Sequence, residues 1–150
     1  MKSSAVTADF FEVPAARREE SLCEKVSAFY ESGERLYVWA PSEAAAKKLD
    51  ELLWTFRDNS FVPHALWSGE ETPLSEPVAV GWKRGNPNGA KKLVVAGPVD
   101  VKELLSAQDS FSSIADFVPS GDKAATISAR ERYKLLREAG VELTHHPLNG

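Results

Sequence analysis

Three stretches of the chain repeat their apolar residues at the spacing of an α-helix. In residues 17–32 the apolar residues lie four, seven and eight positions after Leu22. Gly33 follows, where this helix is expected to stop. A second periodic stretch begins after Ser42, which stands in the position of an N-cap. A third covers residues 123–139 and ends before Gly140, the expected C-cap. The pattern therefore predicts three long amphipathic helices.

Short apolar runs lie between these helices and predict β-strands. They occupy residues 7–12, 35–40, 78–81, 92–96 and 111–117. A short strand is also expected within residues 61–67, and a short helix over residues 99–105. Helices that alternate with strands favour a mostly parallel sheet with helices on both faces. No repeat or linker divides the sequence, so residues 1–150 are expected to form a single α/β domain.

The charge and composition of the chain exclude several classes of protein. Its 18 Lys and Arg against 22 Asp and Glu give a net charge of −4, which argues against general nucleic-acid binding. No apolar run reaches the roughly 20 residues that span a bilayer. Asp9 and Glu12 interrupt the N-terminal apolar residues too early for a signal peptide. A single cysteine excludes an internal disulfide. We therefore expect a cytoplasmic protein with no membrane partner.

Catalytic, metal-binding and cofactor-binding patterns are missing from the sequence. Residues 85–92 are rich in glycine, but their spacing is short for a phosphate loop and a strand follows them instead of a helix. The neighbouring His145 and His146 are interpreted as part of a frayed tail, and Cys23 as a small core residue. Several carboxylates have no spacing that pairs them: Asp50, Glu51, Asp58 and Asp116. We expect no catalytic residue, no metal and no cofactor.

One face of the last predicted helix combines basic residues with a tyrosine. Arg130, Tyr133, Lys134 and Arg137 share this face because residues three, four and seven apart stack along a helix. Residues 130–137 contain four positive residues and one negative residue. A local basic patch on an acidic protein suits a small acidic ligand better than a nucleic-acid duplex. An ordinary solvated helix face is the alternative interpretation.

A second candidate surface is aromatic. Trp54 lies about 140° around the second helix from Leu49, away from its apolar stripe. An outward tryptophan indicates a contact with another molecule. The residues grouped with it are Phe61, Pro63 and His64. The alternative is that Phe61 and Val62 simply close the bottom of the sheet.

Five ordered segments together resemble the chi subunit of the bacterial DNA polymerase III clamp-loader assembly. They are ADFF at residues 8–11, LDELLW at 49–54, SFVPH at 60–64, DFVP at 116–119 and ARERYKLLREAG at 129–140. The resemblance spans nearly the whole chain in order and spacing, although residues 67–92 carry little of it. It implies a Rossmann-like, three-layer α/β domain.

The resemblance also implies two protein partners. In this family the C-terminal helix receives the C-terminal tail of the single-stranded-DNA-binding protein, SSB, which is acidic and ends in phenylalanine. Arg130, Tyr133 and Lys134 match the family's positions, Arg137 is added on helix geometry, and Val118 is expected to line the apolar pocket. The surface of Trp54, Phe61, Pro63 and His64 is expected to contact the psi subunit, which joins chi to the clamp loader.

Two other functions stay open at this point. The order of elements also fits a small nucleotide-binding α/β enzyme, although fold alone does not determine function. A direct binder of single-stranded DNA could use Trp54 and Trp67 as stacking platforms, although the net acidity weakens that reading. The expected role is a non-catalytic adaptor that reaches DNA mainly through SSB.

Overall fold

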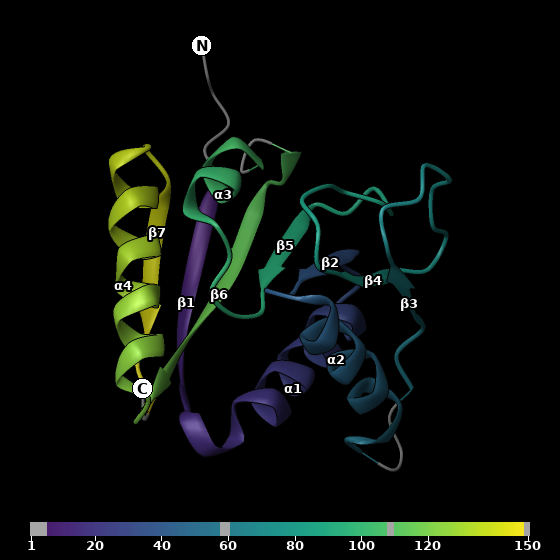
Figure 1. The fold of residues 1–150 in the computed structure, drawn as a ribbon, viewed down its shortest axis with the longest axis horizontal. Coiled ribbons are helices and arrows are strands. Elements are labelled where there is room, and N and C mark those ends of the chain that lie inside the picture. The colour runs from purple at the N-terminus through teal and green to yellow at the C-terminus, as the bar shows by residue number, and fades with distance from the viewer. Residues whose placement is uncertain (1–5, 58–60, 108–109, 149–150) are drawn as a thin grey trace.

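The computed structural model describes residues 6–57, 61–107 and 110–148, and in them seven strands form one parallel sheet (Figure 1). Their spatial order is β3-β4-β2-β5-β6-β1-β7. The strands are β1 (Thr7–Pro14), β2 (Leu36–Trp39), β3 (His64–Trp67), β4 (Val78–Gly81), β5 (Lys92–Val95), β6 (Ser113–Ser120) and β7 (Glu142–His146). Every described pairing in the sheet is parallel. The predicted α/β class is therefore confirmed.

Helices cover both faces of this sheet. They are α1 (Arg18–Glu31), preceded by the short 3-10 turn η1 (Ala15–Arg17), α2 (Glu43–Thr55), α3 (Val101–Ala107) and α4 (Lys123–Glu138). Buried residues of α1 and α2 pack on one face, whereas those of α3 and α4 pack on the other. Both arrangements can be followed in Figure 1. The three-layer architecture predicted from the sequence is confirmed.

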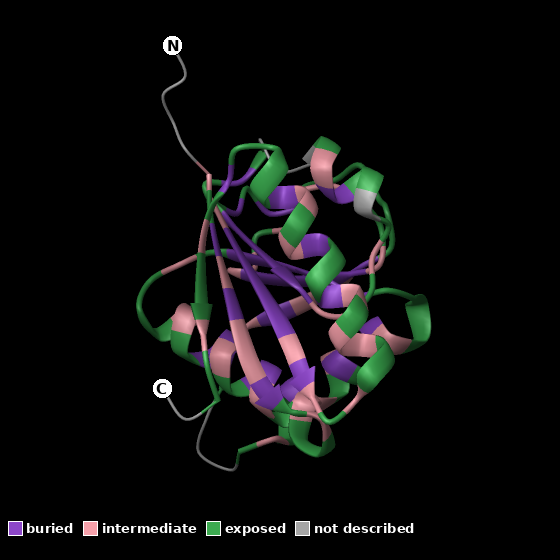
Figure 2. Cartoon of the chain, turned by 90° about the vertical axis from the view of Figure 1, so that its left-hand side faces the viewer, coloured by how far each residue is buried: buried purple, intermediate pink, exposed green. Residues whose placement is uncertain are grey.

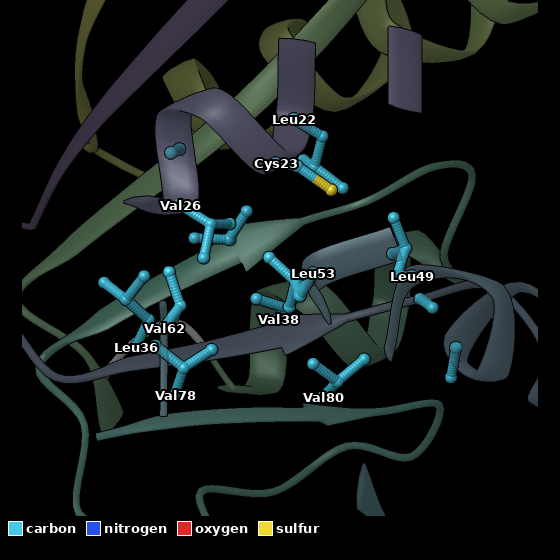
Figure 3. Close-up of a cluster of buried hydrophobic side chains, with 14 of the residues drawn as sticks. Leu22, Cys23, Val26, Leu36, Val38, Leu49, Leu53, Val62, Val78 and Val80 are labelled. Atoms are coloured by element: carbon cyan, nitrogen blue, oxygen red, sulfur yellow. The ribbon is translucent and has the colours of Figure 1, made fainter. Parts of the chain in front are cut away.

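The core consists of two apolar layers, one on each side of the sheet. In β2 the side chains of Leu36 and Val38 join the layer under α1 and α2, and those of Tyr37 and Trp39 join the layer under α3 and α4. Figure 3 shows the first layer, and Figure 2 shows that the central strands are largely buried while the outer helix surfaces are exposed. Each fully buried aliphatic side chain contributes about 1.5–3 kcal/mol. Burial on both faces explains why β2 is continuously apolar.

The ends of the long helices follow the signals in the sequence. Ser42 Oγ accepts a hydrogen bond from the backbone N–H of Ala45 at 3.2 Å, as expected for an N-cap. Asp122 Oδ1 accepts one from the N–H of Ala125 at 3.0 Å and caps α4 in the same way. Gly140, just after α4, has a φ of 91°, a left-handed conformation that favours glycine. The predicted cap and stop are confirmed.

The strand expected over residues 111–117 continues through the DFVP segment, where the sequence pattern of an apolar run ending at a proline predicts a turn. Residues 116–119 lie within β6, where Val118 pairs with Glu12 and Pro119 pairs with Val13. The pairing of β6 with β5 ends at Ala115, so Pro119 belongs to a part of the strand with a partner on one side only. A residue without a backbone N–H is tolerated there. The turn that follows begins at Gly121 instead.

The C-terminal histidines also differ from expectation, because they belong to a strand. His145 and His146 end β7, which pairs in parallel with β1 at the edge of the sheet. The sequence of β7 is mostly polar and lacks the alternation that predicts a strand. Its pairing with β1 is supported by side chains, since His145 Nε2 lies 2.8 Å from Glu12 Oε2 and His146 Nε2 lies 2.8 Å from Asp9 Oδ1. The prediction of a frayed tail was wrong.

Candidate functional site

A buried ion pair joins α4 to the sheet. Arg132 Nε donates to Asp116 Oδ2 at 2.6 Å and Nη2 donates to Oδ1 at 2.9 Å, in a two-bond arrangement. Arg132 also donates to Ser128 Oγ at 2.7 Å. Burial raises the pKa of the Asp116 carboxyl, and the guanidinium of Arg132 opposes that shift. Sequence analysis found no partner for Asp116 and counted Arg132 in the basic span 130–137, whereas the structure pairs the two residues and buries both.

The opposite side of α4 presents the predicted cationic face. Arg130, Lys134 and Arg137 are exposed, and no carboxylate of the described residues pairs with any of them within 4.0 Å. Tyr133 is half-buried beside them, with its ring edge-on to Phe10 at a centroid distance of 5.1 Å. The fixed tyrosine gives this face one rigid apolar wall. Exposed cations therefore lie beside a half-buried aromatic side chain that packs on Phe10.

Two apolar residues share a core layer or a helix side with this face. Val118 of β6 is half-buried and packs in the same core layer as Tyr133. Ile127 is 55% exposed and precedes Arg130 by three residues, so the two share a side of α4. Sequence reasoning missed Ile127, although an isoleucine on the polar side of an amphipathic helix was a usable signal. We call Val118, Ile127, Arg130, Tyr133, Lys134 and Arg137 the α4 surface.

The aromatic surface lies at the other end of the sheet, where α2 contacts β3 (Figure 1). Trp54 is 53% exposed and Phe61 is 64% exposed, with their ring centroids 5.7 Å apart. The outward orientation predicted for Trp54 is confirmed. Phe61 does not close the bottom of the sheet, whereas its neighbour Val62 is 1% exposed and does belong to the core. Pro63, which directly precedes β3, is half-buried.

His64 is placed differently from the other members of this aromatic group. Its side chain is fully buried, with Nδ1 2.7 Å from the carbonyl oxygen of Val62 and Nε2 3.0 Å from that of Asp50. The imidazole ring lies 4.5 Å from the ring of Trp54. His64 therefore supports Trp54 from beneath and is not itself part of the exposed surface.

A cavity of about 230 Å³ opens at the carboxyl ends of the central strands. Its walls are largely apolar and include Leu22, Leu49 and Phe117. Parallel α/β sheets often bind ligands at this edge. The cations that line it are each paired: Arg18 with Asp122, Lys48 with Glu19 and Arg132 with Asp116. The glycine-rich residues 85–92 do not line it, so the cavity and the one phosphate-loop candidate are separate.

The glycine-rich loop of residues 85–92 has a structural role. Asn88 is 4% exposed, and its Nδ2 donates to the carbonyl of Leu36 at 2.9 Å. Arg35 Nε donates to the carbonyl of Asn88 at 2.8 Å. A Cβ atom on Gly85 would lie 2.6 Å from the ring of Trp67, so this glycine allows the loop to pass close to the tryptophan. The loop therefore braces the sheet.

Other chemistry is limited among the described residues. No group of three or more His, Cys, Asp or Glu residues there could hold a metal ion. Cys23 is buried, as predicted, and desolvation raises the pKa of its thiol to about 12, so it stays protonated at neutral pH. No helix of residues 6–57, 61–107 or 110–148 has the length and hydropathy to cross a membrane.

Trp67 does not fit the alternative of direct stacking on single-stranded DNA. It is 8% exposed, and its indole N–H donates to the carbonyl of Glu70 at 3.0 Å. Its ring packs edge-on against Tyr37 at 5.7 Å. A stacking platform needs an exposed aromatic face. Trp67 offers none.

The parallel sheet with helices on both faces places the chain in the Rossmann-like class of α/β proteins. The family model described as "DNA polymerase III chi subunit, HolC" matches residues 6–144. The DNA polymerase III subunit chi of Haemophilus influenzae is 36% identical over 126 residues, which covers 84% of each chain. The chain belongs to the DNA polymerase III chi subunit family.

Further comparisons agree on the family and on the fold. The DNA polymerase III subunit chi of Escherichia coli is 33% identical over 125 residues, which covers 83% of this chain and 82% of that protein. Among solved structures, the C-terminal domain of the DEAD-box protein Dbp5 aligns with a TM-score of 0.70 at 13% identity, covering 98% of this chain and 93% of that one. T4 UvsW aligns with a TM-score of 0.66 at 9% identity, covering 96% of this chain and 41% of that one. At these identities the structural likeness concerns the fold alone.

Proposed function

We propose that this protein is a non-catalytic, cytoplasmic accessory subunit of the DNA polymerase III holoenzyme. It binds the acidic C-terminal tail of SSB on the α4 surface and joins SSB to the clamp loader through a psi-type partner. Membership of the chi subunit family supports the proposal that the protein belongs to the DNA polymerase III assembly. The observation that carries the tail-binding claim is the set of exposed cations around Tyr133, which have no ion-pair partner among the described carboxylates.

Recognition of the terminal carboxylate falls to the cations nearest the tyrosine. Arg130 presents a planar guanidinium that can form two hydrogen bonds to a carboxylate, whereas Lys134 supplies a compact point charge. Arg137 lies one turn beyond Tyr133 on the same side and extends the positive field toward acidic residues upstream in the tail. Exposed cations without intramolecular partners lose no ion pair when the peptide arrives.

The phenylalanine side chain of the tail requires an apolar site next to these cations. Tyr133 is held by Phe10 and provides one wall, and the half-buried Val118 lies in the same core layer. Ile127 adds an exposed apolar side chain one turn before Arg130. An aromatic ring that covers these groups removes apolar surface from water, which contributes about 25 cal/mol for each Å² buried.

The aromatic surface is proposed to bind the psi-type partner. Trp54 and Phe61 form an exposed pair beside Pro63, and large aromatic side chains often dominate interface energies. His64 acts from beneath, because its buried ring holds Trp54 in position. The two partners therefore attach at opposite ends of the sheet and do not compete for one surface.

The mechanism is tethering, and it needs no catalytic group. A weak tail contact gains strength when its partner is already held nearby, because the second binding event becomes intramolecular. We expect purified protein with labelled nucleotides and primed template to show no turnover above a buffer blank. Turnover that co-purifies with the chain would contradict this part of the proposal.

Titration calorimetry with a synthetic peptide tests the tail-binding proposal. The peptide is rich in aspartate and ends in phenylalanine with a free carboxylate, and its control is the same peptide with an amidated C-terminus. We expect the free acid to bind and the amide to bind at least about tenfold more weakly, since a charge-assisted hydrogen bond contributes about 1.5–3 kcal/mol. Equal affinity for both peptides, or no binding of either, would contradict the proposal.

A further inference from the structure

β7 carries two histidine–carboxylate pairs on its two faces. His145 pairs in register with Phe10, whose side chain lies in the layer under α4, so His145 points to that face. His146 stacks on Phe11, which belongs to the opposite layer, with ring centroids 4.5 Å apart. Each imidazole Nε2 lies 2.8 Å from a carboxylate oxygen of β1. The two pairs therefore match in geometry and differ in the face that they occupy.

The His145–Glu12 pair lies next to the α4 surface. Phe10, the register partner of His145, contacts Tyr133 at 5.1 Å. Glu12 is the register partner of Val118, and both point toward the α4 side of the sheet. Helix α4 also contacts β7 directly, and Figure 1 shows the two side by side. The pair thus lies on the same face of the sheet as Val118 and Tyr133, the two residues proposed to receive the tail phenylalanine.

The charged groups on the elements around this pair come from β1, β6 and α4. β1 contributes Glu12, whose second oxygen Oε1 lies 3.4 Å from the N–H of Leu148. β6 contributes Asp116, which Arg132 neutralises. Helix α4 contributes the exposed cations Lys123, Arg130, Lys134 and Arg137, the half-buried Tyr133, and the exposed carboxylates Glu131 and Glu138. Carboxylate, lysine, arginine and tyrosine side chains ordinarily keep one charge state between about pH 6 and 8, whereas histidine is the side-chain type that ordinarily changes its charge there.

Glu12 opposes an acidic ligand, and the charge of His145 decides by how much. When the imidazole is neutral, the carboxylate of Glu12 leaves a net negative charge beneath the tail. When the imidazole is protonated, the pair is neutral and no longer opposes the field of Arg130 and Lys134. The aspartates of the tail stay ionised above about pH 6, so the peptide itself contributes no change in this range.

We propose that His145, held by Glu12, is a further residue of the SSB-tail site and makes tail binding stronger as the pH falls. This inference rests on the proposed function of the α4 surface. His145 acts as a proton-dependent positioning and charge-balancing residue, and the acidic tail is the ligand class that it favours.

The test is the affinity for the free-acid tail peptide at about pH 8 and about pH 6. Wild-type protein should bind about two- to fivefold more tightly at the lower pH, the range expected for one exposed ion pair. The variant His145→Gln should lose this pH dependence and bind at both values like the wild type at the higher one. The matched control His146→Gln lies on the opposite face and should keep the pH dependence.

The possible outcomes separate this inference from the proposed function. Tail binding that is independent of pH, or unaffected in its pH dependence by His145→Gln, overturns the role of His145 and leaves the α4 surface intact. Loss of the pH dependence in His146→Gln as well assigns the effect to attachment of β7 and also overturns it. Failure of the wild type to bind the peptide at either pH overturns the proposed function, and the role of His145 with it.

Discussion

The buried and exposed sides of α4 use the same type of side chain for different purposes. Arg132 is 2% exposed and its guanidinium is shared between Asp116 and Ser128. Arg130, two residues earlier, is exposed and has no ion pair with a described carboxylate. Two residues correspond to about 200° around a helix, which carries the side chain from one side to the other.

This difference teaches that the charge of α4 has two separate functions. The buried guanidinium orients the helix on the sheet, and its donors are already used by protein acceptors. The exposed guanidinium contributes little to folding, because exposed charges that lack partners have small effects on stability, and its donors are free for a ligand. Substitutions at the two positions should therefore change different measured quantities.

The largest effect is expected for Arg132→Ala. Removing the guanidinium leaves the Asp116 carboxylate buried without its partner, so the free energy of unfolding should fall by about 3–5 kcal/mol. The matched control Arg130→Ala should change it by no more than about 0.5 kcal/mol. Urea unfolding monitored by circular dichroism measures both. A loss under about 1 kcal/mol for Arg132→Ala would show that the pair does not hold α4.

A second prediction extends the comparison to the aromatic surface, whose residues are exposed like Arg130. Phe61→Ala should weaken association with a psi subunit by about 2 kcal/mol or more, the range of interface hot spots, and leave tail binding unchanged. The variant should stay folded because Phe61 is 64% exposed. Association measured by surface plasmon resonance checks this. Undiminished binding by a folded variant would remove Phe61 from the partner surface.

A smaller effect is expected from salt, which should weaken binding at the α4 surface more than binding at the aromatic surface. Raising the ionic strength from about 0.15 M to about 1 M shortens the screening length from about 8 Å to about 3 Å. Tail affinity should then fall severalfold, because Arg130 and Lys134 are exposed, whereas psi association through Trp54 and Phe61 should change little. Titrations at both salt concentrations test this. Equal sensitivity of the two associations would contradict the division into a charged and an aromatic surface.

The sequence predicted the features that depend on local periodicity. The stripe of α2 placed Trp54 outward, and Ser42 marked where that helix begins, since both follow from helix geometry and capping. The ion pair of Arg132 could not be predicted from the sequence. Its partner Asp116 is sixteen residues away on a strand, and helical periodicity carries no information on such a contact. A basic residue in line with Ala129 and Leu136 was nevertheless a sign of burial.

The remaining differences have the same origin in tertiary contacts. β7 has a polar sequence and becomes a strand through pairing with β1, so local propensity did not indicate it. His64 was predicted to belong to the aromatic surface because it follows Phe61 and Pro63 in the sequence. In the structure its ring is buried next to Trp54, where its two nitrogens lie within hydrogen-bond distance of the carbonyl oxygens of Val62 and Asp50. Contacts between elements decided both cases.

The central claim, that the exposed side of α4 receives the SSB tail, is tested most directly by calorimetry on Arg130→Ala. We predict that this variant binds the free-acid tail peptide about 1.5–3 kcal/mol more weakly than the wild type and keeps its free energy of unfolding. Its matched control is Arg57→Ala, which removes an exposed arginine just after α2 and should bind the peptide like the wild type. Unchanged affinity in Arg130→Ala, or an equal loss in Arg57→Ala, would contradict the placement of the tail on α4.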